Sequence, residues 1–429
     1  MKKITQIAGL FALTAILGLS SCKKDDDNND STTPSAVAKT YIVSDVDLDG
    51  TVYTQIQGTI NTDYTFEASK NWMLSGGVFV ADGSTLTIEA GTTIKAADDG
   101  ATAFLTIAQG GKIMAEGTAT EPIVFTSVKA TPAPGDWGGI IINGYATINV
   151  AGGTAEGEGG SGTYGGTDDA DTSGILKYVR VEYAGRILGT DNELNGFAFQ
   201  GVGSGTNVEY VQAYRGADDG FEFFGGAVNI RHAVSTGNHD DSFDWTQGWT
   251  GNGQFMVVNQ HTDAGDRGFE ADNNGDDDSA EPFSNPTLSN ITVLMADDGD
   301  AKNTGFRLRA GTKGKIYNAI VTDAPDNGFR VSDEDGTTQT ADNMADGSLL
   351  VTSSISSSTN TNAWKDCDLF ANDANNAVTD ASFLTGYVGV YTGDESTDPS
   401  TLGSFFTAAN YIGAVEAGDD WTAGWTKSL

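Results

Sequence analysis

Charged residues recur at one position of a repeated strand motif. Six phenylalanines follow short polar or glycine-containing turns, at Phe197, Phe221, Phe243, Phe269, Phe306 and Phe329. The residues directly after them are Ala198, Glu222, Asp244, Glu270, Arg307 and Arg330. Because successive side chains of a strand point to opposite faces, phenylalanines facing a core would place these residues in one outward column. Neighbouring strands lie about 4.8 Å apart, so this column would bring carboxylates close together.

Carboxylates at such spacings can carry out glycoside chemistry. A retaining glycosidase needs two carboxyl groups about 5 to 5.5 Å apart, and an inverting one needs about 6.5 to 9.5 Å. Glu222, Asp244 and Glu270 are therefore candidate catalytic residues, with Arg307 beside them. The same column can instead be a self-neutralising ladder without chemistry, because structural ion-pair networks also collect charges. The sequence leaves both alternatives open.

Further candidate residues flank the column. Aromatic rings beside hydrogen-bonding acids and arginines suit sugars. The candidate ligand-binding residues on this ground are Trp245, Trp249, Asp241, Arg267, Asp272 and Arg309. Asp218, Asp240 and Asp266 stand in the turns before the strands, and oxygen ligands of this kind favour calcium. Aspartates in turns also accept hydrogen bonds from backbone N–H groups, which is the simpler explanation for them. His232 alternates with core residues and is expected to face solvent.

These residues require a scaffold that stacks strand upon strand. The six phenylalanines are 24, 22, 26, 37 and 23 residues apart. A second apolar run recurs beside each of them, at residues 178–183, 208–214, 228–234, 254–258, 288–294 and 316–321. A period near 22 residues that holds two or three short strands is one coil of a solenoid. The sequence therefore predicts an all-β, right-handed parallel β-helix. A β-sandwich would require hairpin-linked antiparallel strands instead.

The ends of such a solenoid must be capped, because open strand edges invite unwanted pairing. We expect an N-terminal cap at residues 40–80, the β-helix at residues 81–340, and C-terminal coils with a cap at residues 341–429.

The first 21 residues have the pattern of a lipoprotein signal peptide. Lys2 and Lys3 precede an apolar run that ends at the small-residue stretch before Cys22. A cysteine in this place is typical of the lipidation site of bacterial lipoproteins, and two acyl chains hold a protein stably on a membrane. Residues 22–39 are rich in charged and polar residues and are predicted to be a flexible tether. We therefore expect an outer-membrane protein anchored in lipid through acylated Cys22.

The net charge limits the partners. The formal charge of −36 becomes −38 without the signal peptide, since 21 basic residues then stand against 59 acidic ones. Such a surface repels nucleic acid, so no nucleic-acid partner is expected. Cys367 is the only cysteine besides Cys22, so no disulfide within the chain is expected after lipidation.

Several segments resemble a family of bacterial right-handed parallel β-helix lipoproteins. They are residues 135–144, 240–245, 265–273 and 421–425, and the resemblance covers nearly the whole mature chain. The lysines and aspartates after Cys22 resemble the surface-export signal of Bacteroidota lipoproteins. The resemblance implies the fold and a place on the cell surface, and it leaves the function open. It also implies a TonB-dependent transporter as a partner.

The function expected from these features is binding of an extracellular ligand, for which we predict a glycan, as an accessory to uptake. The alternatives are a polysaccharide-degrading enzyme, either a glycoside hydrolase or a lyase, and an adhesive or structural surface protein.

Overall fold

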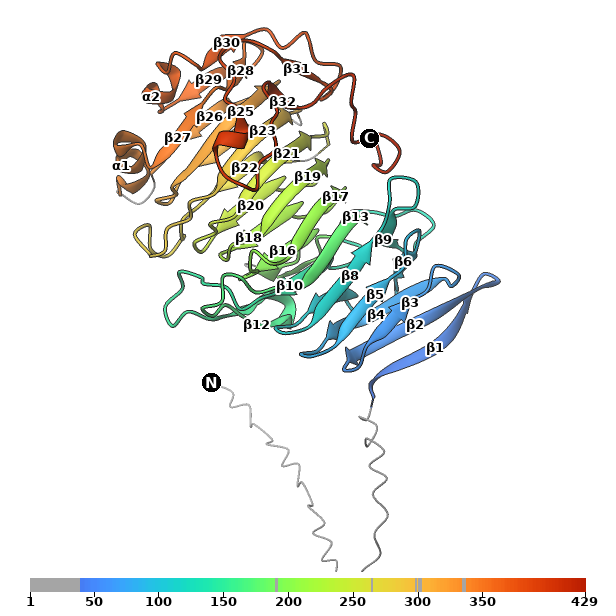
Figure 1. Cartoon of the computed structure of the whole chain (residues 1–429). Helices are drawn as coiled ribbons and strands as arrows, with labels where there is room; N and C mark the ends of the chain where they lie inside the picture. The colour runs from blue at the N-terminus through green and yellow to red at the C-terminus, as the bar shows by residue number, and fades with distance from the viewer. Residues whose placement is uncertain (1–38, 190–191, 264, 298, 300–302, 334–336) are drawn as a thin grey trace, which may run out of the picture. The chain divides into compact units, whose positions relative to one another are not determined.

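The computed structural model describes residues 39–429 apart from 190–191, 264, 298, 300–302 and 334–336. Cys22 and the tether lie outside the described residues. The described part of the chain is nearly all β, and 26 of its strands join in one sheet. Strands of successive coils pair in parallel, which confirms the predicted parallel β-helix (Figure 1). None of the described helices is long and apolar enough to cross a membrane.

Each coil contributes strands to three faces. The first, called the site face below, carries the repeat phenylalanines. Its strands are β7 (Phe104–Ile107), β10 (Ile140–Asn143), β16 (Phe197–Gln200), β18 (Phe221–Phe224), β20 (Phe243–Thr246), β22 (Arg267–Ala271), β24 (Thr304–Leu308), β26 (Asn327–Val331) and β29 (Asn362–Lys365). The stacking follows the chain order, so residues one coil apart in sequence lie side by side in space.

The other two faces are largely built from long strands that bend in the middle. These are β13 (Gly174–Glu182), β17 (Asn207–Tyr214), β19 (Asn229–Thr236), β21 (Asn252–Asn259), β23 (Thr287–Leu294) and β25 (Gly314–Thr322). Shorter strands complete the second face: β3 (Tyr64–Phe66), β5 (Thr85–Ile88), β8 (Lys112–Glu116) and β27 (Leu349–Thr352). The third face is completed by β6 (Thr93–Ala96), β9 (Ile123–Ser127), β28 (Ile355–Ser357) and β30 (Ala377–Thr379).

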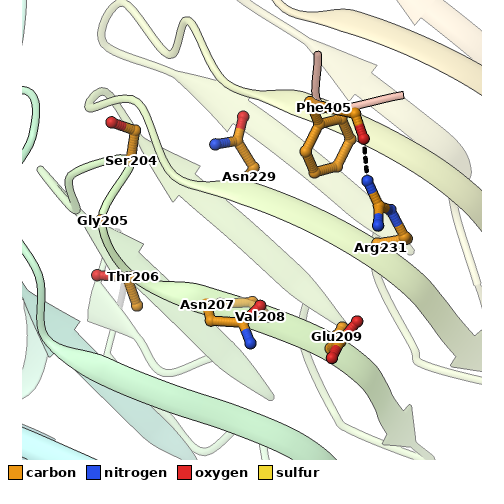
Figure 2. A pocket seen from close by; sticks show the side chains of 9 residues that line it. All are labelled: Ser204, Gly205, Thr206, Asn207, Val208, Glu209, Asn229, Arg231 and Phe405. Atoms are coloured by element: carbon orange, nitrogen blue, oxygen red, sulfur yellow. Dashed lines mark hydrogen bonds between the residues drawn. The ribbon is translucent and has the colours of Figure 1, made fainter. Parts of the chain in front are cut away.

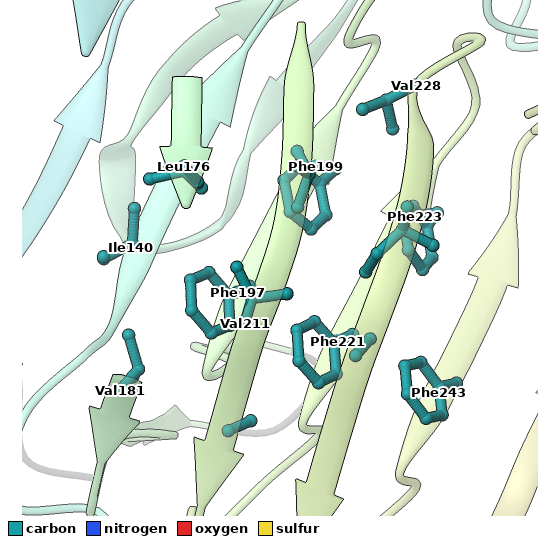
Figure 3. Packing of buried hydrophobic residues seen from close by; sticks show 14 of the residues in the cluster. Ile140, Leu176, Val181, Phe197, Phe199, Val211, Phe221, Phe223, Val228 and Phe243 are labelled. Carbon is teal, nitrogen blue, oxygen red and sulfur yellow. The ribbon is translucent and has the colours of Figure 1, made fainter. Parts of the chain in front are cut away.

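The repeat phenylalanines form a continuous stack inside the helix. Ring centroids are 5.1 Å apart for Phe197 and Phe221, and 4.9 Å apart for Phe221 and Phe243 (Figure 3). The stack continues to Phe329 and ends on Trp364, 4.6 Å further on. Offset aromatic pairs contribute about 0.5 to 1.5 kcal/mol each beyond area burial. This ladder fixes the register of the site face, since a slip of one residue would turn every phenylalanine outward.

The bend in the long strands places a second stack on the outside of the coils. Tyr210, His232 and Phe255 have φ values of 54°, 55° and 61°, in the left-handed region. His232 is stacked between Tyr210, at 4.2 Å, and Phe255, at 4.9 Å, and Trp421 packs against it. The expectation that His232 faces solvent is therefore wrong, because the C-terminal segment covers this column. Burial lowers the pKa of His232 to about 3.

Residues 397–429, called the C-terminal segment below, run back along the coils. Amide side chains of alternate coils exchange paired hydrogen bonds with its backbone. Asn318 pairs with Thr397 at 2.8 and 3.0 Å, Gln254 with Thr407 at 2.9 Å, and Gln212 with Lys427 at 2.8 Å. The remaining C-terminal elements are α1 (Gln339–Asp346), α2 (Asp368–Ala371), β31 (Gly389–Tyr391), η2 (Pro399–Thr401) and β32 (Ile412–Val415).

At the other end, β1 (Thr40–Leu48) and β2 (Thr51–Ile60) form an antiparallel hairpin. Strand β2 then pairs in parallel with β4 (Trp72–Val80), from Thr54 onward. The parallel coils therefore begin inside the segment that we expected to be the cap. Two small hairpins project from the coils: β11 (Ala155–Gly157) with β12 (Gly162–Tyr164), enclosing η1 (Glu158–Gly160), and β14 (Ile187–Gly189) with β15 (Asn192–Glu193).

Candidate carboxylate site

The outward column expected from the sequence exists in the predicted order. Ala198 pairs with Glu222, Glu222 with Asp244, and Asp244 with Glu270 on adjacent strands of the site face. Glu270 then pairs with Arg307, and Arg307 with Arg330. This order follows from the phenylalanine stack, because each column residue lies next to a buried ring.

The turns before these strands bring more carboxylates to the same place. The Asp219 Oδ1 accepts a hydrogen bond from the backbone N–H of Asp241 at 2.9 Å, and the Asp241 Oδ1 accepts one from the N–H of Arg267 at 2.7 Å. These two aspartates therefore link each turn to the next coil. Asp218, Asp240 and Asp266, the predicted metal ligands, stand beside them.

Four groups of three described carboxylate residues could each hold a cation. Within each group, one oxygen of every residue lies within 4.8 Å of those of the other two. The groups are Asp218, Asp219 and Asp240; Asp219, Glu222 and Asp244; Asp240, Asp241 and Asp266; and Asp241, Asp244 and Glu270. Because the groups share members, they form one continuous cluster, called the carboxylate site below. All four groups consist of carboxylates alone, a donor set that suits a hard cation such as calcium.

Arginines pair with one end of this site, where Arg267 lies 2.8 Å from Asp266 and 3.5 Å from Asp241. Glu270 lies 2.9 Å from Arg267, 3.3 Å from Arg307 and 2.7 Å from Arg309. Arg309 also pairs with Asp272 at 2.7 Å. In the described part of the chain, no arginine or lysine nitrogen lies within 4 Å of a carboxylate oxygen of Asp244. The Asp244 Oδ1 is buried and has no hydrogen-bond partner there.

Burial and mutual repulsion hold protons on this site. Burial is the main cause that raises the pKa of Asp218 to about 8, and the charge of Asp240 is the second cause. Burial also raises the pKa of Asp240 to about 6, with Asp266 as the next cause. The pKa values of Glu222 and Asp244 lie well above their usual range, first from burial and then from Asp244 and Glu270, respectively. Without a cation, part of the site is therefore neutral near pH 7.

The two tryptophans do not belong to this surface. Trp245 is 1% exposed and Trp249 is 0% exposed, so the prediction that they flank a sugar is wrong. Trp245 is two residues after Phe243 and points inward, where its Nε1 donates to the Thr312 Oγ1 at 3.0 Å. The Trp249 Nε1 donates to the Val228 carbonyl at 3.0 Å, and its ring stacks on Phe223. Both rings fill the core of the helix.

Several residues near the site were missed by the sequence analysis. The Asn195 Nδ2 donates a short hydrogen bond to Glu222. Glu158, between β11 and β12, is half-buried; this desolvation raises its pKa to about 7, and its charge also raises the pKa of Glu222. Asp219 could have been found from the repeated Asp-Asp pair of the turns. Glu158 lies in a loop outside the repeat, so no periodic pattern marks it.

A separate cavity of about 240 Å³ lies on the second face. Asn229, Arg231 and Phe405 line it, and Arg231 donates to the Phe405 carbonyl (Figure 2). None of the predicted site residues lines this cavity.

Comparison with known proteins supports one assignment. Neither the curated proteins nor the solved structures include a significant match. The family description "pectate-lyase like beta helix domain" matches residues 58–426, most of the chain and all of the carboxylate site. With its stacked parallel coils, this chain belongs to the family of pectate-lyase-like β-helix domains.

Proposed function

We propose that this protein binds calcium at the carboxylate site and, through the ion, an extracellular glycan. The observation that carries the proposal is that four overlapping groups of three carboxylate residues form one cluster. In the described part of the chain, arginines pair with only one end of this cluster. Calcium takes six to eight oxygen ligands, so carboxylates from adjacent coils can supply most of one coordination sphere. A bound cation would also offset the repulsion between Glu222, Asp244 and their neighbours.

The glycan part of the proposal rests on the family and on the chemistry of the ion. Family membership fits a polysaccharide-related role. Sugar hydroxyl or carboxylate oxygens can complete a calcium coordination sphere that the protein leaves open. With both tryptophans in the core, the proposed ligand contacts here are polar: Arg267 and Arg309 remain the proposed ligand-binding residues. Asp241 and Asp272 are buried, at 3% and 7% exposed, and would act through the arginines with which they pair.

We place this function at the cell surface. Acylated Cys22 would hold the protein in the outer-membrane lipid, and the tether would present the carboxylate site outside the cell. A TonB-dependent transporter is the proposed partner that would take up the bound glycan.

Calorimetry tests the calcium step. Full-length protein stripped with EDTA is titrated with CaCl₂, and its melting temperature is measured with and without the ion. At one hundred times the dissociation constant, calcium would stabilise the folded state by about 2.7 kcal/mol. Absence of binding heat together with an unchanged melting curve would contradict the proposal. A polysaccharide panel, measured with calcium and with EDTA, then tests the glycan step.

A second candidate function is glycan cleavage, which one observation supports. Glu222 and Asp244 occupy paired positions on adjacent strands, and both have raised pKa values. A protonated carboxyl group beside an ionised one is the arrangement a glycosidase uses. Glu270 and Arg307 would then stabilise charge. Release of reducing ends or unsaturated products from the same polysaccharide panel would distinguish cleavage from binding. A protein that neither binds nor cleaves these polysaccharides would favour an adhesive role.

A further inference from the structure

Strand β1 is a free edge of the main sheet. It pairs with β2 over nine residues, and among the described residues it has no second neighbouring strand. Its outer edge therefore presents unpaired backbone N–H and C=O groups, which can accept another strand. Proteins usually protect such edges with proline, lysine or a bulge. Strand β1 contains no proline or lysine and its register with β2 is unbroken, and its charged residues are Asp45 and Asp47.

The hairpin around this edge also exposes aliphatic side chains. Ile42 is 63% exposed and Val52 is 53% exposed, and Val43 and Leu48 are exposed as well. Four of the eleven large hydrophobic residues that stand out on the described surface thus belong to one hairpin. Strand alternation places Ile42 and Leu48 on one face of the hairpin and Val43 and Val52 on the other, so apolar surface is exposed on both faces beside the open edge.

The geometry of the hairpin shows which backbone groups are free. Asp49 and Gly50 both have positive φ values, 52° and 81°, as in the two-residue turn that closes on a hydrogen-bonded pair. That pair is Leu48 and Thr51. Hydrogen bonding alternates along an antiparallel pair, so the odd-numbered residues of β1, Tyr41 to Asp47, direct their N–H and C=O groups to the open edge.

A second copy of β1 is complementary to this edge. An antiparallel pair related by a two-fold axis at Ser44 joins Tyr41 with Asp47 and Val43 with Asp45, so the free backbone groups of both copies meet. It is the one register about a central residue that pairs all nine residues of the strand. A shift of the axis to Asp45 would shorten the pairing and set two carboxylates against each other.

Side chains favour the same register. Ile42 of one copy would lie opposite Val46 of the other, which covers exposed aliphatic surface. Lys39 would lie opposite Asp49, so an opposite charge pair would form at each end of the shared ladder. Asp45 and Asp47 would each face an uncharged residue.

We propose that this protein forms a dimer by edge-to-edge pairing of β1 with β1 of a second copy, about a two-fold axis at Ser44. The two solenoids then share one continuous sheet. The dimer is independent of the proposed calcium and glycan binding, because β1 contributes no residue to the carboxylate site.

Disulfide trapping tests the register. Residues facing each other at a non-hydrogen-bonded antiparallel position have Cβ atoms about 4.5 to 5.5 Å apart, close to the reach of a disulfide. Full-length Ser44→Cys should therefore form a covalent dimer on mild oxidation. Gln57→Cys, an exposed position on β2 away from the open edge, is the matched control. Cys367 is buried, which raises the pKa of its thiol to about 12 and keeps it unreactive. Equal crosslinking of the two variants would overturn the register.

Sedimentation tests the dimer itself. In about 150 mM salt, where the Debye length is about 8 Å, the wild type should show a concentration-dependent dimer. Ser44→Lys would set two ammonium groups against each other at the axis and should yield monomers, whereas Gln57→Lys should dimerise like the wild type. Melting curves would confirm that both variants fold, since both positions are exposed. A wild type that stays monomeric, or a dimer that persists in Ser44→Lys, would overturn the proposal.

Discussion

Asp244 and Glu270 are paired on adjacent strands of the site face, yet their electrostatic surroundings are opposite. Glu270 lies within 3.3 Å of three arginines, whereas the Asp244 Oδ1 is buried without a hydrogen-bond partner among the described residues. Two neighbouring carboxylates therefore have different roles. Glu270 ties the arginines together, and Asp244 is the ligand that we propose for the cation.

Asp244→Asn is expected to weaken calcium binding by tenfold or more. The amide keeps the shape of the side chain but removes the charge that attracts the ion. In the absence of calcium, the same change should raise the melting temperature at pH 8, because it removes a charge repelled by its neighbours. Calorimetry of Asp244→Asn beside Glu116→Gln, an exposed carboxylate on β8, measures both effects. Equal calcium affinity in the two variants would exclude Asp244 as a ligand.

Glu270→Gln is expected to destabilise the protein by about 3 to 5 kcal/mol, the usual effect of removing one partner from a buried ion pair. The change leaves Arg267, Arg307 and Arg309 close together without the carboxylate that all three contact. Chemical denaturation gives the free energy of unfolding. A loss below about 1 kcal/mol would mean that these ion pairs are no stronger than those on a solvated surface.

The calcium-free protein should lose stability as the pH rises from about 4 to about 8. Burial raises the pKa of Asp218 to about 8, of Glu158 to about 7 and of Asp240 to about 6. The folded state therefore binds more protons than the unfolded state in this range, so the free energy of unfolding falls with rising pH. Saturating calcium should flatten the dependence, because the ion replaces the protons. Melting curves at several pH values, with EDTA and with CaCl₂, measure this; an EDTA series that rises or stays level would contradict it.

Trp245→Ala is expected to destabilise the fold by about 3 to 5 kcal/mol, as is usual for removing a large aromatic side chain from a core. Trp245 is fully buried, and its Nε1 bonds to Thr312. At a temperature where the variant remains folded, its affinity for a glycan should match that of the wild type. A stable variant that has lost glycan binding would restore Trp245 as a contact surface.

Cys22→Ser should release the protein from membranes, since it removes the residue that we propose to be acylated. Replacing Asp25, Asp26 and Asp27 with alanine should keep the protein lipidated but leave it facing the periplasm. Fractionation and protease treatment of intact cells give the two readouts. Complete protection of the wild type from protease would contradict a place on the cell surface.

The sequence alone determined the coil and the charged column. The recurrence of Phe221, Phe243 and Phe269 predicts the stacking, and strand alternation then places Glu222, Asp244 and Glu270 side by side. Both inferences hold because they rest on local periodicity, which every coil repeats.

Only the tertiary structure decided which of these residues are exposed, paired or covered. Trp245 is the exception, because strand alternation applied one residue beyond Asp244 already turns it into the core, where the structure has it. His232 is covered by Trp421, which comes from the far end of the chain. The unequal electrostatic surroundings of Asp244 and Glu270 depend on Arg307 and Arg309, one coil beyond. Such contacts join residues distant in sequence, and no local pattern records them.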